Sequence, residues 1–153
     1  MKLRVIWIGK TKDPGLSKLT TDFVQRLQRF VPVEITEVKD PKTGDDRRQL
    51  AAEEEKLLAT LDSNDRVIVL DAGGQQWTSQ QLATFVGKHL GRDPRRLTFV
   101  IGGYGGLTKA VKDRADKVWS LSPLTFTHEM TRVLVVEQLY RAMCILKNHP
   151  YSK

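Results

Sequence analysis

The sequence has 153 residues, of which 40% are hydrophobic and 28% are charged, and this composition excludes a fibrous or an intrinsically disordered chain. Its length suits a single domain, residues 1–153, and its lone cysteine, Cys144, excludes a disulfide framework and fits the reducing cytoplasm. No apolar run approaches the roughly 20 residues of a membrane span, and the opening run MKLRVIWIGK is too short for a secretory leader.

The formal net charge of +7, with an isoelectric point near 9.7, has two interpretations. A positive surface keeps a protein soluble. It also supplies the part of nucleic-acid binding that does not depend on sequence. The lysines and arginines recur at predicted loops and helix faces instead of forming one block, which is typical of a folded basic surface. Charge alone therefore leaves an RNA partner open without establishing it.

Apolar runs alternate with helical patterns along the first half of the chain. Residues 3–8 form an apolar, β-branched run typical of a strand, and apolar side chains at helical spacing predict a helix over 16–30. Residues 31–38 alternate as expected for a half-exposed strand, and the proline- and glycine-containing segment after them predicts a loop. A charged amphipathic helix is predicted over 50–61.

The second half of the chain continues this alternation. Continuous apolar runs at 67–70 and within 95–103 predict strands covered on both faces, with a helix between them. A short helix is expected over 108–117, followed by a last strand over 118–126 that Pro123 must bend or interrupt. Strands and helices that alternate in this way predict an α/β fold, with a mainly parallel sheet and flanking helices.

The longest predicted helix spans residues 128–146, with Thr127 as its N-cap and Pro150 beyond its end. Its apolar side chains cover nearly the whole circumference, a pattern typical of a helix buried on all sides. Two arrangements would bury it: a central position in one core, or a face shared with a second copy in a two-fold dimer. We expect the dimer, because burial on both faces is hard to arrange within one chain of 17.4 kDa.

The stretch LTFVIGGYGGLTKAV, residues 97–111, contains two glycine pairs directly after a predicted strand. In a parallel sheet with helices on its faces, ligands bind at the carboxyl ends of the strands. Two other predicted strand ends, residues 71–74 and 120–128, are also rich in glycine, serine or threonine. Together these ends are suited to binding one ligand through backbone groups. The alternative is that the glycines only permit positive φ in tight turns.

Motifs for other chemistries fit poorly. The dinucleotide fingerprint G-x-G-x-x-G would place its third glycine where Thr108 stands, and GGLTK reverses the lysine-then-threonine order of a P-loop. His89, His128 and His149 lie far apart in the sequence, and with a single cysteine they predict no metal site. His128, at a helix start, is either a cap or packed surface residue or a catalytic group.

Residues 100–151, VIGGYGGLTKAVKDRADKVWSLSPLTFTHEMTRVLVVEQLYRAMCILKNHPY, resemble the C-terminal half of the RlmH family. The opening MKLRVIWIGK and the central VLDAGGQQWTSQQLA follow in the family's order. These proteins are SPOUT-superfamily methyltransferases that modify N3 of a pseudouridine in 23S ribosomal RNA. The resemblance implies an α/β domain with a deep C-terminal trefoil knot, a homodimer, and S-adenosylmethionine as methyl donor without a metal. It implies 23S rRNA in the large ribosomal subunit or ribosome as partner, and no membrane.

The resemblance also implies the site residues. Cofactor contacts are expected on the three strand ends described above: Leu70 and Asp71, Gly102 and Gly103, and Ser122, Pro123, Leu124, Thr125, Phe126 and Thr127. His128 and Tyr151 are expected to transfer a proton or to orient the base, and Arg132 and Arg141 to stabilise an anion or contact phosphates. For Arg141 the alternative is a simple helix pair with Glu137.

This sequence departs from the family pattern at three places. Tyr104-Gly105-Gly106 stands where the family has an acidic or amide residue, Thr127 replaces a proline, and Ser152 replaces a tail histidine. A unique role for the tail histidine is therefore disfavoured. Two other classes stay open: a non-catalytic ribosome- or RNA-binding protein, which would bind RNA without the cofactor, and a nucleotide- or flavin-binding α/β enzyme, which would bind those ligands instead.

Overall fold

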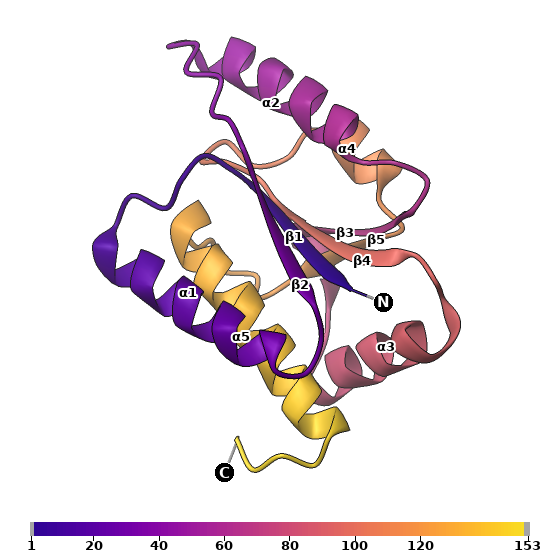
Figure 1. Ribbon diagram of the computed structural model, residues 1–153. Coiled ribbons are helices and arrows are strands. Elements are labelled where there is room, and N and C mark those ends of the chain that lie inside the picture. The colour runs from indigo at the N-terminus through magenta and orange to yellow at the C-terminus, as the bar shows by residue number, and fades with distance from the viewer. Residues whose placement is uncertain (1, 152–153) are drawn as a thin grey trace.

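The computed structural model describes residues 2–151, so Ser152, one of the departures from the family pattern, lies outside the described residues. Within them, strands and helices alternate strictly along the chain (Figure 1). The strands are β1 Leu3–Ile8, β2 Val33–Val38, β3 Asp65–Gln76, β4 Arg96–Ile101 and β5 Lys117–Ser120. The helices are α1 Pro14–Gln28, α2 Asp46–Thr60, α3 Ser79–Arg92, α4 Lys109–Arg114 and α5 His128–Leu146.

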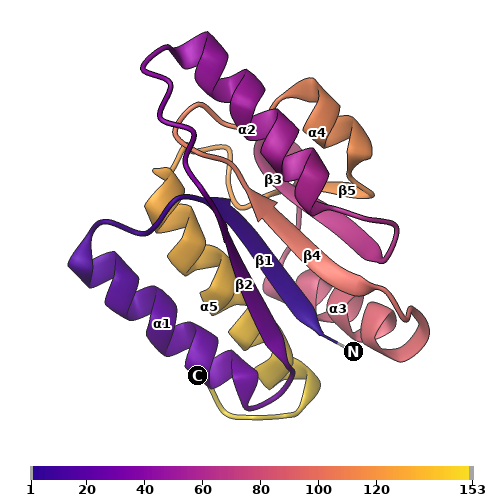
Figure 2. The same ribbon diagram turned by 45° about the horizontal axis from the view of Figure 1, so that its top comes forward.

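The strands form one sheet in the order β2-β1-β4-β3-β5, and every neighbouring pair is parallel. This arrangement confirms the expected α/β fold with a parallel sheet and flanking helices. Figures 1 and 2 show α1, α3 and α5 on one face of the sheet and α2 and α4 on the other. The carboxyl ends of all strands therefore meet at one edge of the sheet.

Both faces of the sheet are buried, which explains the continuous apolar runs of the inner strands. In β1, Val5 and Trp7 belong to the core shared with α1, α3 and α5, whereas Ile6 and Ile8 belong to the core under α2 and α4. Successive side chains of a strand point to opposite faces, so a strand covered on both sides needs apolar residues at every position.

The helix starts follow local side-chain chemistry. The Asp13 carboxylate accepts the Leu16 N–H at 3.0 Å at the start of α1. At the start of α5, the predicted cap Thr127 accepts the Met130 N–H through its hydroxyl oxygen, at 3.3 Å. Each cap satisfies one backbone donor that the first helical turn leaves without a partner.

The position of α5 differs from our expectation. It packs against α1 and α3 on one face of the sheet (Figure 2). Its residues Val136, Leu139 and Met143 are buried within this one chain. A single chain therefore supplies the burial that we attributed to a second copy. The central position in one core, the alternative above, accounts for the apolar circumference of α5, and this pattern is no longer an argument for a dimer.

Strand lengths also differ from the sequence-based expectations. The strand predicted over 118–126 ends at Ser120. The Ser120 hydroxyl donates to the Ser122 carbonyl, and the Ser122 hydroxyl accepts the Leu124 N–H, so the chain turns around Pro123, which has no N–H to donate. In contrast, β3 continues beyond residue 70, with a register shift against β5 between Leu70 and Gln75. The segment after β5 is thus a loop. Among residues 2–151, no helix is both long and apolar enough to cross a membrane.

Candidate cofactor cleft and active site

A cleft of about 720 Å³ opens beside residues 70–72 of β3 and at the carboxyl ends of β4 and β5. This volume is within the range of small-molecule sites in proteins. Nine of the ten predicted cofactor contacts line it: Leu70, Asp71, Gly102, Gly103, Ser122, Leu124, Thr125, Phe126 and Thr127. The tenth, Pro123, is exposed and is not part of the lining. Segments that are far apart in the sequence therefore come together as the parallel topology predicts.

The glycine turn forms one wall of this cleft, and its geometry requires glycine. The Gly106 N–H donates to the Gly103 carbonyl at 3.0 Å, and Gly106 has a φ of +80°, which side-chain-bearing residues rarely adopt. A Cβ added at Gly102 would lie 2.7 Å from the Gly106 carbonyl oxygen. The turn is therefore both a tight corner and a wall of the cleft, and the two readings of the glycines are compatible.

The charge of Asp71, which lies within β3 next to its register shift, is compensated. Its carboxylate lies 3.0 Å from the Lys112 ammonium and accepts the Gly73 N–H at 2.9 Å. Burial opposes ionisation of this group, but the Lys112 ammonium and the Gly73 N–H outweigh it and lower the pKa of Asp71. At neutral pH this wall of the cleft thus carries a paired carboxylate.

His128 begins α5 and lies at the cleft, next to the segment that ends at Thr127. Burial lowers its pKa below 6.5, and the positive charge of Arg132 lowers it further. The imidazole is therefore neutral at pH 7 and has a free nitrogen lone pair, as a proton acceptor requires.

Arg132 occupies a different environment from the one that a phosphate contact needs. Its side chain is fully buried, and its guanidinium donates to the Ile8 carbonyl at 2.6 Å and to the Thr11 hydroxyl at 3.0 Å. It also lies 5.1 Å from the ring centre of Trp7. In this structure the hydrogen bonds of Arg132 link α5 to the end of β1, and its side chain does not reach solvent. The structure therefore does not support the expected direct contact with RNA phosphates.

Arg141 and Tyr151 lie together, away from the cleft. The Arg141 guanidinium and the Tyr151 hydroxyl both donate to the Glu137 carboxylate, at 3.0 and 3.1 Å. The Arg141 guanidinium also lies 5.0 Å from the Tyr151 ring centre, so the helix pair with Glu137 expected as the alternative does form. At about 1.5 Å of rise per residue, Arg141 lies roughly 20 Å along α5 from His128. One chain thus does not bring the predicted catalytic residues together.

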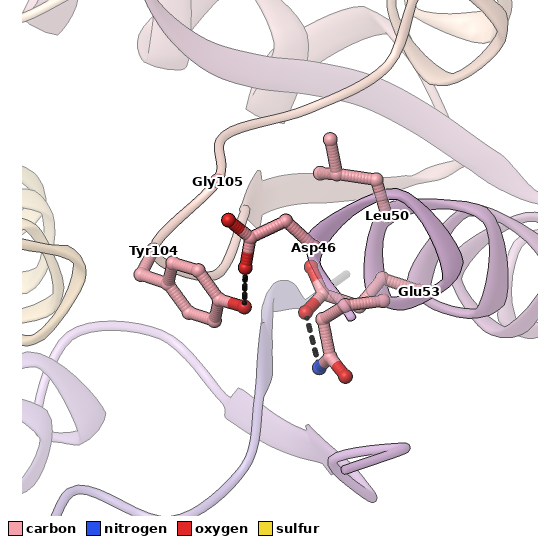
Figure 3. Close-up of a pocket in the computed structure, with 6 residues that line it drawn as sticks. Asp46, Leu50, Glu53, Tyr104 and Gly105 are labelled. Atoms are coloured by element: carbon pink, nitrogen blue, oxygen red, sulfur yellow. Dashed lines mark hydrogen bonds between the residues drawn. The ribbon is translucent and has the colours of Figure 1, made fainter. Parts of the chain in front are cut away.

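Two residues of the site were not singled out from the sequence as functional. Glu53, in α2, is buried behind the glycine turn, and Tyr104, in the turn itself, donates its hydroxyl to Asp46 at 2.8 Å (Figure 3). Tyr104 was visible only as a departure from the family pattern. Glu53 gave no signal, because it lies among the consecutive glutamates of a charged amphipathic helix.

No group of three or more histidine, cysteine, aspartate or glutamate side chains in residues 2–151 is arranged to hold a metal ion. The cleft itself offers backbone groups, hydroxyl groups and apolar side chains, with one neutral imidazole at its edge and the Asp71 carboxylate paired with Lys112. Such a lining suits an uncharged, aromatic ligand portion read by the backbone better than it suits a metal or a polyphosphate.

The fold and this cleft define a methyltransferase of the SPOUT class. The family model described as "Predicted SPOUT methyltransferase" matches residues 1–152, and the chain belongs to this family. A protein of Trichlorobacter lovleyi named "Ribosomal RNA large subunit methyltransferase H" is 44% identical over 151 residues, which cover 99% of each chain. A protein of the same name from Gloeobacter violaceus is 37% identical, over 99% of this chain and 98% of its own.

Two solved structures show the same fold at low sequence identity. The tRNA (m1G37) methyltransferase from Aquifex aeolicus superimposes with a TM-score of 0.58 at 14% identity, over 92% of this chain and 70% of that one. A probable methyltransferase from Bordetella pertussis Tohama I superimposes with a TM-score of 0.57 at 15% identity, over 93% and 96% of the two chains.

Proposed function

We infer that this chain is an S-adenosylmethionine-dependent methyltransferase that modifies the RNA of the large ribosomal subunit. One observation carries the inference: the full-length match to proteins of that name coincides with a cleft at the three strand ends where the cofactor was expected. The net charge of +7 fits an RNA substrate, which is contacted mostly through phosphates, and a ribosomal substrate fits a cytoplasmic protein.

At the level of the base, we propose N3 of a pseudouridine in 23S rRNA of the assembled large subunit as the methyl acceptor. The methyl carbon would leave the sulfonium sulfur and bond to N3 in a single in-line displacement, which needs no metal. The N3 proton must go to a base, and neutral His128 at the edge of the cleft is the group that we assign to accept it. The remaining catalytic work is positioning and electrostatic stabilisation.

We further propose that the complete active site needs two copies of the chain. Support comes from the separation within one chain, where His128 lies at the cleft and the Glu137, Arg141 and Tyr151 cluster lies farther along α5. In a two-fold dimer, the cluster of one copy can approach the cleft of the other, because each copy presents both ends of its α5. Arg141 would then stabilise the deprotonated base or contact RNA.

A mixing experiment tests the shared site. His128→Gln and Arg141→Met would each inactivate a homodimer, but subunits exchanged between the two variants would form some sites with neither substitution. We expect the mixture to regain partial methylation activity, whereas each variant alone stays inactive. A mixture as inactive as its components, with subunit exchange verified by mass spectrometry, would contradict a site shared between subunits.

The family also leads us to propose a deep trefoil knot in the C-terminal part. In support, the chain leaves β5 at one edge of the sheet and returns as α5, which packs against α1 and α3. Pulling the unfolded chain from its two ends tests this proposal. A knotted chain reaches a shorter final length than its residue count allows, and full extension would contradict the knot.

The activity itself is tested by binding and by product analysis. We expect calorimetry to show binding of S-adenosylmethionine and none of ATP or FMN. We also expect rRNA from cells without the protein to lack one methyl group on a pseudouridine, by mass spectrometry. Binding to ribosomes without cofactor binding would favour the non-catalytic alternative. Ribosome affinity should fall steeply with salt, because each neutralised phosphate releases counterions.

A further inference from the structure

Helix α2 supports the glycine turn from behind. A Cβ added at Gly103 would lie 3.0 Å from both carboxylate oxygens of Glu53, and one added at Gly105 would lie 3.0 Å from a methyl carbon of Leu50. Between these glycines, Tyr104 donates its hydroxyl to Asp46 (Figure 3). A second, smaller cavity of about 340 Å³ lies between α2 and the turn. The Glu53 carboxylate thus lies against Gly103, a residue that lines the cofactor cleft.

This carboxylate is buried and incompletely paired. Glu53 is only 3% exposed, and one of its oxygens accepts a hydrogen bond from the Gln49 side-chain amide at 2.8 Å. The other oxygen, Oε1, has no hydrogen-bond partner among the described residues. Within residues 2–151, no lysine or arginine forms an ion pair with it. Its negative charge is therefore not neutralised by a neighbouring cation.

The groups that face Glu53 come from three segments. Asp40, ahead of α2, accepts from the same Gln49 amide at 2.8 Å. Asp46 lies about two turns before Glu53 on the same face of α2, where it accepts from Tyr104. Burial raises the pKa of Glu53 and the charge of Asp40 adds to the shift, while the hydrogen bond from Gln49 opposes it. When ionised, the carboxylate places a negative charge in a region of low dielectric, where it acts over a longer distance than at the surface.

The cofactor changes its charge during the reaction. The methyl donor carries a positive sulfonium, and the product, S-adenosylhomocysteine, carries a neutral thioether at the same position. A fixed negative charge behind the cleft wall attracts the donor and has little effect on the product. Asp71, the carboxylate that lines the cleft itself, is paired with Lys112 and contributes less to this difference.

We propose that Glu53 determines cofactor specificity: its buried carboxylate, directly behind Gly103, makes the cleft prefer the cationic methyl donor over the neutral product. This inference rests on the proposed function, since it presupposes that the cleft binds S-adenosylmethionine. It assigns to α2, which does not line the cleft, a role in product release after each methyl transfer.

Calorimetric affinities for the donor and the product test this role, with wild-type protein, Glu53→Gln and a matched control, Glu55→Gln. Glu55 lies on the same helix and loses the same charge, but it is exposed and its charge is screened by solvent. We expect Glu53→Gln to lower the ratio of donor to product affinity about tenfold, which corresponds to roughly 1.4 kcal/mol. The control should retain the wild-type ratio.

A merely structural role for Glu53 predicts a different result. If Glu53 only supports the turn, Glu53→Gln will weaken both ligands equally and leave their ratio unchanged, and this outcome would overturn the proposal. A wild-type protein that binds neither ligand would instead refute the proposed function. The two failures are therefore distinguishable in the same data.

A pH series on the wild-type protein provides the second measurement, which needs no variant to fold. Because the pKa of Glu53 is raised above 4.5, lowering the pH from about 8 protonates this carboxyl group before it protonates an ordinary glutamate. The preference for the donor should decline as the pH is lowered in the wild type. It should stay constant in Glu53→Gln, and a parallel decline in that variant would contradict the proposal.

Discussion

Replacement of Arg132 by methionine should destabilise the whole protein and not act on RNA binding alone. The substitution removes two hydrogen bonds, to Ile8 at 2.6 Å and to Thr11 at 3.0 Å, and the contact with the Trp7 ring. A hydrogen bond from a charged donor contributes about 1.5–3 kcal/mol, and a desolvated cation–π contact contributes about 2 kcal/mol. Part of this lost stabilisation is offset, because burying a charged guanidinium costs a large desolvation free energy that a methionine side chain does not have.

We therefore expect Arg132→Met to lower the free energy of unfolding by about 2–4 kcal/mol. For a chain of about 150 residues, each kcal/mol shifts the Tm by roughly 2–4 °C, so the expected loss is about 5–15 °C. Thermal denaturation followed by circular dichroism measures it. S-adenosylmethionine affinity and methylation should fall together in this variant, because the end of β1 is released from α5.

Arg141→Met is the matched control on the same helix. The Arg141 side chain is 29% exposed and its pair with Glu137 spans one helical turn, which is worth only about 0.3–0.5 kcal/mol. Its Tm should stay near that of the wild type while methylation is lost. An Arg132→Met variant that keeps the wild-type Tm and loses only methylation would refute the structural role of Arg132. That result would favour a contact between Arg132 and RNA phosphates instead.

Three further predictions follow from the contacts around the cleft. Gly103→Val should abolish S-adenosylmethionine binding in calorimetry, because the new side chain would collide with the Glu53 carboxylate and displace the turn; unchanged affinity would contradict this. Glu53→Gln should raise the Tm at about pH 8. The folded-state pKa of Glu53 is raised above 4.5, so the wild-type protein loses stability as the pH rises through that pKa. The Tm values of variant and wild type should therefore converge below pH 4.5, and a difference that is constant with pH would contradict the burial of an ionisable Glu53. The methylation rate should fall on acidification below pH 6.5 as His128 becomes protonated. If the residual activity of His128→Gln shows the same decline at acidic pH, another group is the base.

Local patterns in the sequence were sufficient for the layout of the fold. Continuous apolar runs predicted the strands that are covered on both faces, and Thr127 caps α5 as expected. The same reasoning indicated the edge of the sheet where a ligand would bind, because a parallel sheet brings the carboxyl ends of its strands together. The ten cofactor contacts themselves were implied by the resemblance to the RlmH family. Nine of them line the cleft, and their binding to the cofactor stays a prediction.

The environments of charged side chains could be decided only by the tertiary structure. Arg132 was predicted to stabilise an anion or to contact phosphates, but its guanidinium donates to the Ile8 carbonyl, 124 residues earlier in the chain. Glu53 looks like its neighbouring glutamates in the sequence, yet it alone of Glu53, Glu54 and Glu55 is buried, against a turn formed 50 residues later. Helical periodicity reports which face of a helix is apolar, and it carries no information on which distant segment packs there. Burial and ionisation depend on that segment, because desolvation and long-range hydrogen bonds set them.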